Sequence, residues 1–232
     1  MSGSLPKAYR VGRQDFYGRD FLVTPDVLIP RPETEMAVDM VLNWVGAVFL
    51  PGVKPAAARL PHEMRILDVG TGSGCIAITL KMMLPEADVS ACDISEKALA
   101  VAKRNAKNMG AKVNFCRSNL LENMPNVGDF DVVVANLPYV DEKWEWLDHE
   151  MLAVEPREAL FAKDEGLDLI KRLVCELANV SAQETSEKTR AKPQYLILEA
   201  DPCQHEKIIQ YASGFGLKHI ETRGFILGFL KG

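Results

Sequence analysis

The chain has 232 residues, of which 47% are hydrophobic and 25% charged, the composition of a globular protein with a sizeable core. Its formal net charge of −5 argues against a protein-wide basic surface for nucleic acid. No apolar run could span a membrane, and the five cysteines and four histidines lack disulfide or metal-ligand spacing. We therefore expect a monomer without a metal site, cytoplasmic, or organellar if a targeting segment was removed.

The first 60 residues predict an N-terminal arm ahead of a catalytic domain over residues 61–232. A glycine turn at Gly18, between aromatic and β-branched residues, predicts a β-hairpin. Residues 31–49 predict an amphipathic helix, because Pro32 suits a first helical turn and two glutamates follow it. A Pro/Ala-rich stretch then separates the arm from the domain.

From residue 65 onward, predicted strands alternate with predicted helices. Strands are expected at 65–69, 87–93, 112–116, 130–135, 195–200, 217–221 and 225–230, and helices at 74–84, 95–110, 165–180 and 203–214. The polar stretch 181–194 predicts a mobile insertion. The fold class is therefore α/β, a doubly wound, mostly parallel seven-stranded sheet that ends in an antiparallel hairpin.

The first predicted strand runs into three alternating glycines, Gly70, Gly72 and Gly74. Glycines allow a tight turn and the close approach of a ligand. The next strand ends at Asp93, whose carboxylate can accept both ribose hydroxyls of a nucleoside. The pattern also fits a dinucleotide fingerprint, but Asp68 at the mouth of the loop would repel a pyrophosphate and attract a cationic amino group. We therefore predict S-adenosylmethionine, with S-adenosylhomocysteine as its product, rather than NAD.

A second motif, Asn136-Leu137-Pro138-Tyr139, follows the buried strand at 130–135. The side-chain oxygen of Asn136 and the carbonyl of Leu137, held by the Pro138 turn, can accept both N–H bonds of a planar amine. The ring of Tyr139 can lie against the flat π-system. Two acceptors favour a localised nitrogen lone pair, so positioning and charge stabilisation would carry catalysis. The alternative is a structural proline turn after a strand.

At these residues the sequence resembles the HemK/PrmC family, the class I glutamine N5-methyltransferases of peptide-chain release factors. The resemblance covers about residues 6–232 and rests on "VLIPRPETE", "LDVGTGSGCIAITL", "EPREALFAKDEGLDLI" and "LILEA" followed by a glutamine. It implies a Rossmann-like fold, S-adenosylmethionine as cofactor, and the glutamine of a Gly-Gly-Gln motif as substrate. It also implies that residues 31–35 begin a helix that lids the cofactor cleft beside Tyr139, where the alternative is an ordinary helix start.

The sequence departs from the family pattern in three places. Leu137 stands where the family usually has a proline. The family's N-terminal helical substrate domain is missing, which implies either a shortened chain or a natural short form with different partner contacts. "EADPCQ" and the last strand match loosely and are interpreted as structural. Glu155 and Pro156 either shape the substrate side of the site or form a solvated loop.

The candidate site residues fall into overlapping sets. The predicted catalytic residues are Asn136, Leu137, Pro138 and Tyr139, and the substrate-binding set adds Arg31 and Glu33. The predicted cofactor-binding residues are Asp68, Gly70, Thr71, Gly72, Ser73, Gly74, Asp93, Ile94, Asn119, Leu120 and Asn136. The function expected first is release-factor glutamine methylation. An adenine N6-methyltransferase acting on RNA or DNA, and a non-enzymatic protein that keeps the cofactor fold, stay as alternatives.

Overall fold

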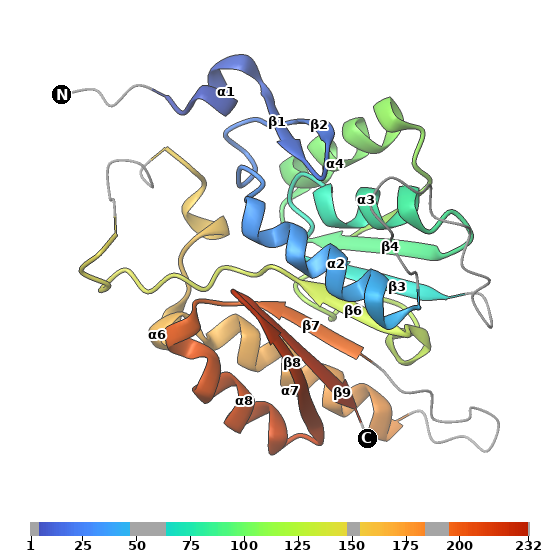
Figure 1. Cartoon of the computed structure of the whole chain (residues 1–232), viewed down its shortest axis with the longest axis vertical. Helices are drawn as coiled ribbons and strands as arrows, with labels where there is room; N and C mark the ends of the chain where they lie inside the picture. The colour runs from blue at the N-terminus through green and yellow to red at the C-terminus, as the bar shows by residue number, and fades with distance from the viewer. Residues whose placement is uncertain (1–4, 47–63, 148–153, 184–194, 232) are drawn as a thin grey trace.

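Figure 1 shows the chain as a computed structural model, which describes residues 5–46, 64–147, 154–183 and 195–231. The helices are α1 (Lys7–Val11), α2 (Glu35–Trp44), α3 (Cys75–Met83), α4 (Glu96–Met109), α6 (Lys163–Gly166), α7 (Asp168–Gln183) and α8 (His205–Ser213). The strands are β1 (Arg13–Phe16), β2 (Arg19–Leu22), β3 (Arg65–Val69), β4 (Asp88–Asp93), β5 (Asn114–Arg117), β6 (Val132–Ala135), β7 (Tyr195–Glu199), β8 (Leu217–Arg223) and β9 (Ile226–Lys231). Short 3-10 turns are η1 (Pro32–Thr34), η2 (Val127–Asp129), η3 (Arg157–Ala159) and η4 (Pro202–Gln204).

Within the described residues, the main sheet has seven strands in the order β5-β4-β3-β6-β7-β9-β8. The strands from β5 to β7 pair in parallel, and β9 pairs antiparallel with both β7 and β8. The order reverses at β3, which lies between β4 and β6, and in such sheets ligands bind beyond the carboxyl ends of the strands at this switch point. The predicted α/β fold with a terminal antiparallel pair is confirmed.

Side chains that alternate along the central strands fill two hydrophobic cores, one on each face of the sheet. Ile66 packs with α2 and α3, whereas its neighbour Leu67 packs with α7 and α8. Val133 and Val134 of β6 divide between the two faces in the same way. Figure 1 shows α2 lying across one face of the sheet. Because both faces are covered, the central strands are mostly apolar, as parallel strands usually are.

The predicted hairpin is present as β1 and β2, and it is tied to the body by side chains. Asn105 of α4 is buried; its oxygen accepts the Leu22 backbone N–H at 2.8 Å, and its nitrogen donates to the carbonyls of Leu22 and Ser73. On the other side, Glu35 accepts the backbone N–H of Tyr17 at 2.6 Å. The hairpin therefore contacts both the glycine loop and α2. The predicted boundary between residues 60 and 61 lies outside the described residues.

Three predicted segments differ from the structure. The helix expected over 31–49 begins as the η1 turn, and α2 ends at Trp44 because Gly46 takes a left-handed φ of 73°. A short helix, α1, forms in a stretch for which no element was predicted. The insertion expected over 181–194 begins later, since α7 continues to Gln183, and its remainder lies outside the described residues.

Candidate functional site

A cavity of about 360 Å³ lies at the carboxyl ends of β3, β4 and β6, within the size range of small-molecule sites. Twelve of the predicted site residues line it: Arg31, Gly70, Thr71, Gly72, Ser73, Asp93, Ile94, Asn119, Leu120, Asn136, Leu137 and Pro138. Four others, Glu33, Asp68, Gly74 and Tyr139, do not. The glycine loop and the Asn136 turn, which are far apart in sequence, thus share one cavity because β3 and β6 are adjacent in the sheet.

The glycines of the loop have different structural roles. Gly70, Gly72 and Gly74 all take left-handed φ values, of 75°, 54° and 83°. A Cβ on Gly74 would lie 2.8 Å from a methyl group of Ile78 and 3.1 Å from the Cβ of Ala102, so this glycine lets α3 and α4 approach. A Cβ on Gly72 would meet nothing within 4 Å, which leaves the backbone open on the cavity side.

The carboxylate of Asp93 organises the loop from the end of β4. Its Oδ2 accepts the Gly72 N–H at 2.9 Å, and its Oδ1 accepts the Ser95 N–H at 2.9 Å. Burial raises the pKa of this carboxyl, while the backbone N–H groups of Ser95 and Gly72 lower it. Each oxygen keeps a lone pair for a further donor, so the carboxylate can bind two hydroxyl groups of a ligand.

Asp68 lies beneath the loop and is closed off from the cavity. Its Oδ2 accepts the Thr71 hydroxyl at 2.6 Å and the Ala77 N–H at 3.2 Å, and the side chain is fully buried. Its Oδ1 has no hydrogen-bond partner among the described residues. Burial raises the pKa of Asp68 to about 7. The predicted position at the mouth of the loop is therefore wrong; the carboxyl supports the turn from below.

The raised pKa of Asp68 makes folding stability depend on pH. The folded state holds this proton more tightly than the unfolded chain, so stability is greatest below the unfolded value near pH 4 and falls as the pH rises toward 7. Asp68→Asn can still accept both hydrogen bonds and has no such titration. We expect urea denaturation to show that Asp68→Asn gains about 2–4 kcal/mol relative to the wild type between pH 4 and pH 8. A difference that does not change with pH would contradict the raised pKa.

Hydrogen bonds from three other segments fix Asn136 and Tyr139 at the two ends of the Asn136 turn. The Asn136 amide donates from Nδ2 to the hydroxyl oxygen of Thr34 at 3.1 Å. The Tyr139 hydroxyl donates to Glu199 at 3.2 Å, and the Tyr139 carbonyl accepts from the side chain of Gln204 at 2.8 Å. The ring of Tyr139 is thus anchored through its hydroxyl and does not line the cavity. Its expected contact with a flat substrate group stays a prediction.

The side chain of Leu137 packs against the glycine loop. Its side chain is buried, lines the cavity, and has a methyl group 3.0 Å from the position that a Cβ on Gly70 would occupy. Leucine therefore packs the Asn136 turn onto the glycine loop.

This packing leads to a prediction for Leu137→Pro, which introduces the residue that the family usually has. Proline loses part of the apolar contact but keeps the carbonyl, so we expect turnover to fall less than tenfold and the melting temperature to drop by a few degrees. Calorimetry and initial rates measure both quantities. A loss of turnover as large as that expected for Asn136→Ala would show that the leucine side chain itself is required.

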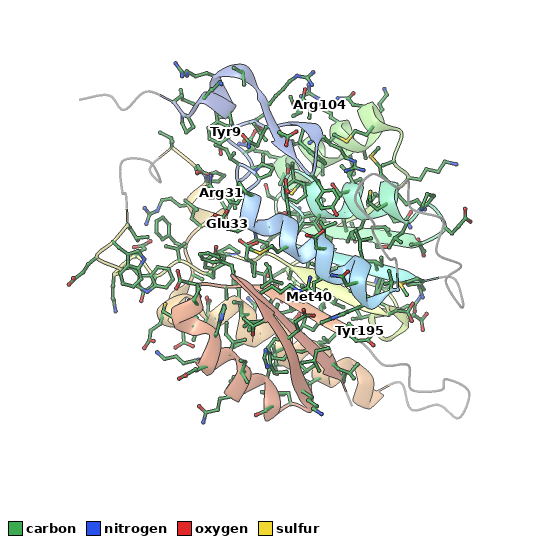
Figure 2. All side chains as sticks on the ribbon, in the orientation of Figure 1. Tyr9, Arg31, Glu33, Met40, Arg104 and Tyr195 are labelled. Carbon is green, nitrogen blue, oxygen red and sulfur yellow. The ribbon has the colours of Figure 1, made fainter. Side chains whose placement is uncertain are left out.

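The arm is joined to the far wall of the cavity by an ion pair. Arg31 donates to Glu155 at 2.6 Å, and the other oxygen of Glu155 accepts the Ile29 N–H at 3.2 Å. Glu155 is only 4% exposed, which excludes the reading of a solvated loop, and Pro156 lines the cavity. Figure 2 shows Arg31 and Glu33 near the start of α2. Glu33 is exposed and does not line the cavity.

Sequence reasoning missed two buried polar residues beside the Asn136 turn, Thr34 and Glu199. Each is 2% exposed. Burial raises the pKa of Glu199, while hydrogen bonding with Thr34, Tyr139 and Asn136 lowers it, and burial is the larger effect. Glu199 was interpreted as structural because its strand end matches the family loosely. Its position at the carboxyl end of a buried strand, as for Asp68 and Asp93, was the available signal.

The described residues contain neither a candidate metal-binding cluster nor a candidate membrane-spanning helix. No group of three or more His, Cys, Asp or Glu side chains could hold a metal ion there. None of the helices in the described ranges has both the length and the apolar character that a membrane span requires.

Comparisons with known proteins show the family to which the chain belongs. The family model described as "Methyltransferase small domain" matches residues 49–161. A release factor glutamine methyltransferase from Koribacter versatilis is 44% identical over 171 residues, covering 72% of this chain and 56% of that protein. Proteins of the same name from Neisseria gonorrhoeae (41% identical, covering 72% and 56%) and Bacillus subtilis (41%, covering 73% and 57%) are similar. The chain belongs to the HemK/PrmC family.

This HemK/PrmC chain spans only about half the length of the curated relatives it matches. Solved structures support its fold. A methyltransferase from Pyrococcus furiosus superposes with a TM-score of 0.57 at 19% identity, covering 93% of this chain and 90% of that chain. A magnesium protoporphyrin IX methyltransferase from Synechocystis, solved with bound SAM, gives a TM-score of 0.51 at 21% identity, covering 86% and 80%. At these identities the likeness concerns the fold alone.

Proposed function

We propose that this protein uses S-adenosylmethionine to methylate the side-chain amide nitrogen (N5) of the glutamine in the Gly-Gly-Gln motif of a peptide-chain release factor. The observation that carries the proposal is the meeting of two motifs on one cavity. The glycine loop with Asp93 offers a nucleoside site, and the Asn136 turn offers acceptors for a planar amide. The relatives named release factor glutamine methyltransferase support the substrate class.

The residues that line the cavity fit the chemistry of S-adenosylmethionine. Asp93 would hold the two ribose hydroxyls, and Ile94, an apolar side chain that is 57% exposed at the cavity edge, would cover the adenine ring. The open backbone at Gly72 would admit the methionine part. Leu120 takes a left-handed φ of 52°, the kind of strained conformation that often occurs at ligand sites. The bound cofactor supplies an electrophilic methyl group.

The remaining chemistry falls to the Asn136 turn. The substrate amide is a poor nucleophile because its nitrogen lone pair is delocalised. Asn136, with its Nδ2 already donating to Thr34, can present its oxygen to one substrate N–H. The Leu137 carbonyl would accept the other, as predicted from the sequence. These acceptors favour the localised lone pair and orient the nitrogen, so positioning supplies the rate enhancement.

Mass spectrometry of a candidate release factor, incubated with the protein and S-adenosylmethionine, tests the proposal. We expect one added methyl group on the Gly-Gly-Gln glutamine. RNA and DNA substrates are included because the Asn-Leu-Pro-Tyr motif also suits adenine N6 as a planar amine. Methyl transfer to adenine with none to the release factor would favour the nucleic-acid alternative. No transfer to either would favour a binding protein without enzyme activity.

A further inference from the structure

We propose that Glu199 is a positioning residue that, both directly and through Thr34, sets which end of the Asn136 side-chain amide faces the substrate. The inference rests on the proposed function, because it assigns Asn136 the task of accepting a substrate N–H. An amide can present either an acceptor or a donor to the cavity. A flipped Asn136 would direct its NH₂ group at the substrate NH₂ group, and the two could not form the required hydrogen bond.

The sheet places Glu199 and Asn136 side by side. Ala135, the last residue of β6, pairs with Leu198 of β7, so the next residues along the two parallel strands are Asn136 and Glu199. Both therefore lie at the carboxyl edge of the sheet. Thr34, at the end of the η1 turn, is buried over the same edge and lines the cavity. Glu199 is buried and does not line the cavity, so it lies behind the residues that would contact substrate.

The directions of the hydrogen bonds follow from the chemistry of a carboxylate, which can only accept. The Tyr139 hydroxyl donates to Oε1 of Glu199 at 3.2 Å. Oε2 of Glu199 is buried without a partner that satisfies hydrogen-bond geometry among the described residues, and the side chains of Thr34 and Asn136 both interact with this carboxyl. We infer that the Thr34 hydroxyl proton is directed to Oε2. A hydroxyl that donates there has only its lone pairs left for Asn136.

The Thr34 oxygen accepts from Nδ2 of Asn136 at 3.1 Å. This bond is the one expected if the Thr34 hydroxyl proton is used for Glu199. The N–H end of the amide is thereby held inside the protein, and the oxygen is left for the cavity. A neutral side chain at position 199 would remove this constraint. The NH₂ group of a glutamine at position 199 can donate to the Thr34 oxygen, and the Thr34 hydroxyl can then donate to the Asn136 oxygen. The side-chain amide of Asn136 can then adopt the flipped orientation. Glu199 would thus act on the reaction without contacting the substrate.

The first test needs no substrate. In the ¹⁵N–¹H spectrum of the protein, the side-chain amide signals of Asn136 are assigned by their loss in Asn136→Ala. We expect Glu199→Gln and Thr34→Val to shift these signals, because each breaks the chain of donors. The matched control Thr34→Ser keeps the hydroxyl and should leave them close to the wild-type position. Signals that stay unchanged in both Glu199→Gln and Thr34→Val would overturn the proposal.

The second test is a double-mutant cycle on methyl transfer. We expect Glu199→Gln and Thr34→Val each to lower kcat about 10²-fold with little change in KM or cofactor affinity. The conservative variant Thr34→Ser, which keeps the hydroxyl, should retain most of the wild-type rate. In an Asn136→Ala background, Glu199→Gln should cost less than about threefold, because Glu199 acts through the missing amide. Equal losses in both backgrounds would indicate general structural damage and would refute the positioning role.

The two tests separate this inference from the proposed function. If the wild type transfers no methyl group to a release factor, the proposed function fails, and the amide signals still decide whether Glu199 orients Asn136. If the wild type is active and both Glu199→Gln and Thr34→Val retain the wild-type rate, the proposed function survives and the positioning role is wrong. Should Glu199→Gln fail to fold, Thr34→Val tests the same chain of donors by exchanging a hydroxyl for a methyl group of similar size.

Discussion

Asn136→Ala is expected to lower kcat by about 10²–10³, the loss seen when one preorganised hydrogen-bonding group is removed from a site that stabilises developing charge. The Asn136 oxygen would be used most strongly when the substrate nitrogen localises its lone pair, that is, in the transition state. The cost should therefore appear in kcat more than in KM. The neighbouring Thr34 and Glu199 stay in place, and the Asp93 loop is untouched. Although Asn136 is also among the predicted cofactor-binding residues, cofactor affinity should therefore fall much less than kcat.

Single-turnover rates on a release factor, with cofactor affinity measured by calorimetry, check this result. The matched control is Asn108→Ala, an asparagine exposed on α4, which should behave as the wild type. Methylation by Asn136→Ala at the wild-type rate would mean that the Asn136 turn is only structural. A loss of cofactor affinity equal to the loss of rate would place Asn136 in the cofactor site instead.

Local signals were enough to predict most of the elements. The helix predicted over 95–110 has such signals at both ends: in the structure, Ser95 accepts the Ala98 N–H, and Gly110 takes a left-handed conformation. These signals lie within a few residues of the element that they bound. The short α1 was missed because it has only five residues and starts after Pro6 without a side-chain cap.

The site could be predicted only in part, because the hydrogen bonds that orient its polar side chains join segments that are distant in sequence. Gly72 and Asp93 lie at the carboxyl ends of two strands that are consecutive in the chain, so their shared cavity could be expected from the chain order. The contact between Asn136 and Thr34 joins residues 102 positions apart, and the contact between Tyr139 and Glu199 joins residues 60 apart. Neither contact has a local signature. Asp68 was misplaced for a related reason, since a strand-end carboxylate can point into a cavity or under a turn.

Asp93→Ala is expected to weaken S-adenosylmethionine binding at least tenfold. The variant removes two charge-assisted hydrogen bonds to the ribose, each contributing about 1.5–3 kcal/mol, and about 1.4 kcal/mol corresponds to tenfold in affinity. The structure adds a second cause. Asp93 also accepts the Gly72 and Ser95 N–H groups, so its loss would leave the glycine loop less ordered before binding. We therefore expect an effect beyond the minimum, reaching 10²-fold or more.

Calorimetry of the wild type, Asp93→Ala and the control Asp15→Ala measures this effect. Asp15 is an exposed aspartate on β1, so its variant should bind as the wild type does. The melting temperature of Asp93→Ala separates the two causes: a small shift with a large loss of affinity assigns the effect to the ribose contacts, and a large shift assigns part of it to the loop. Unchanged affinity in Asp93→Ala, or tight binding of NAD by the wild type, would mean that this loop does not hold the ribose of S-adenosylmethionine.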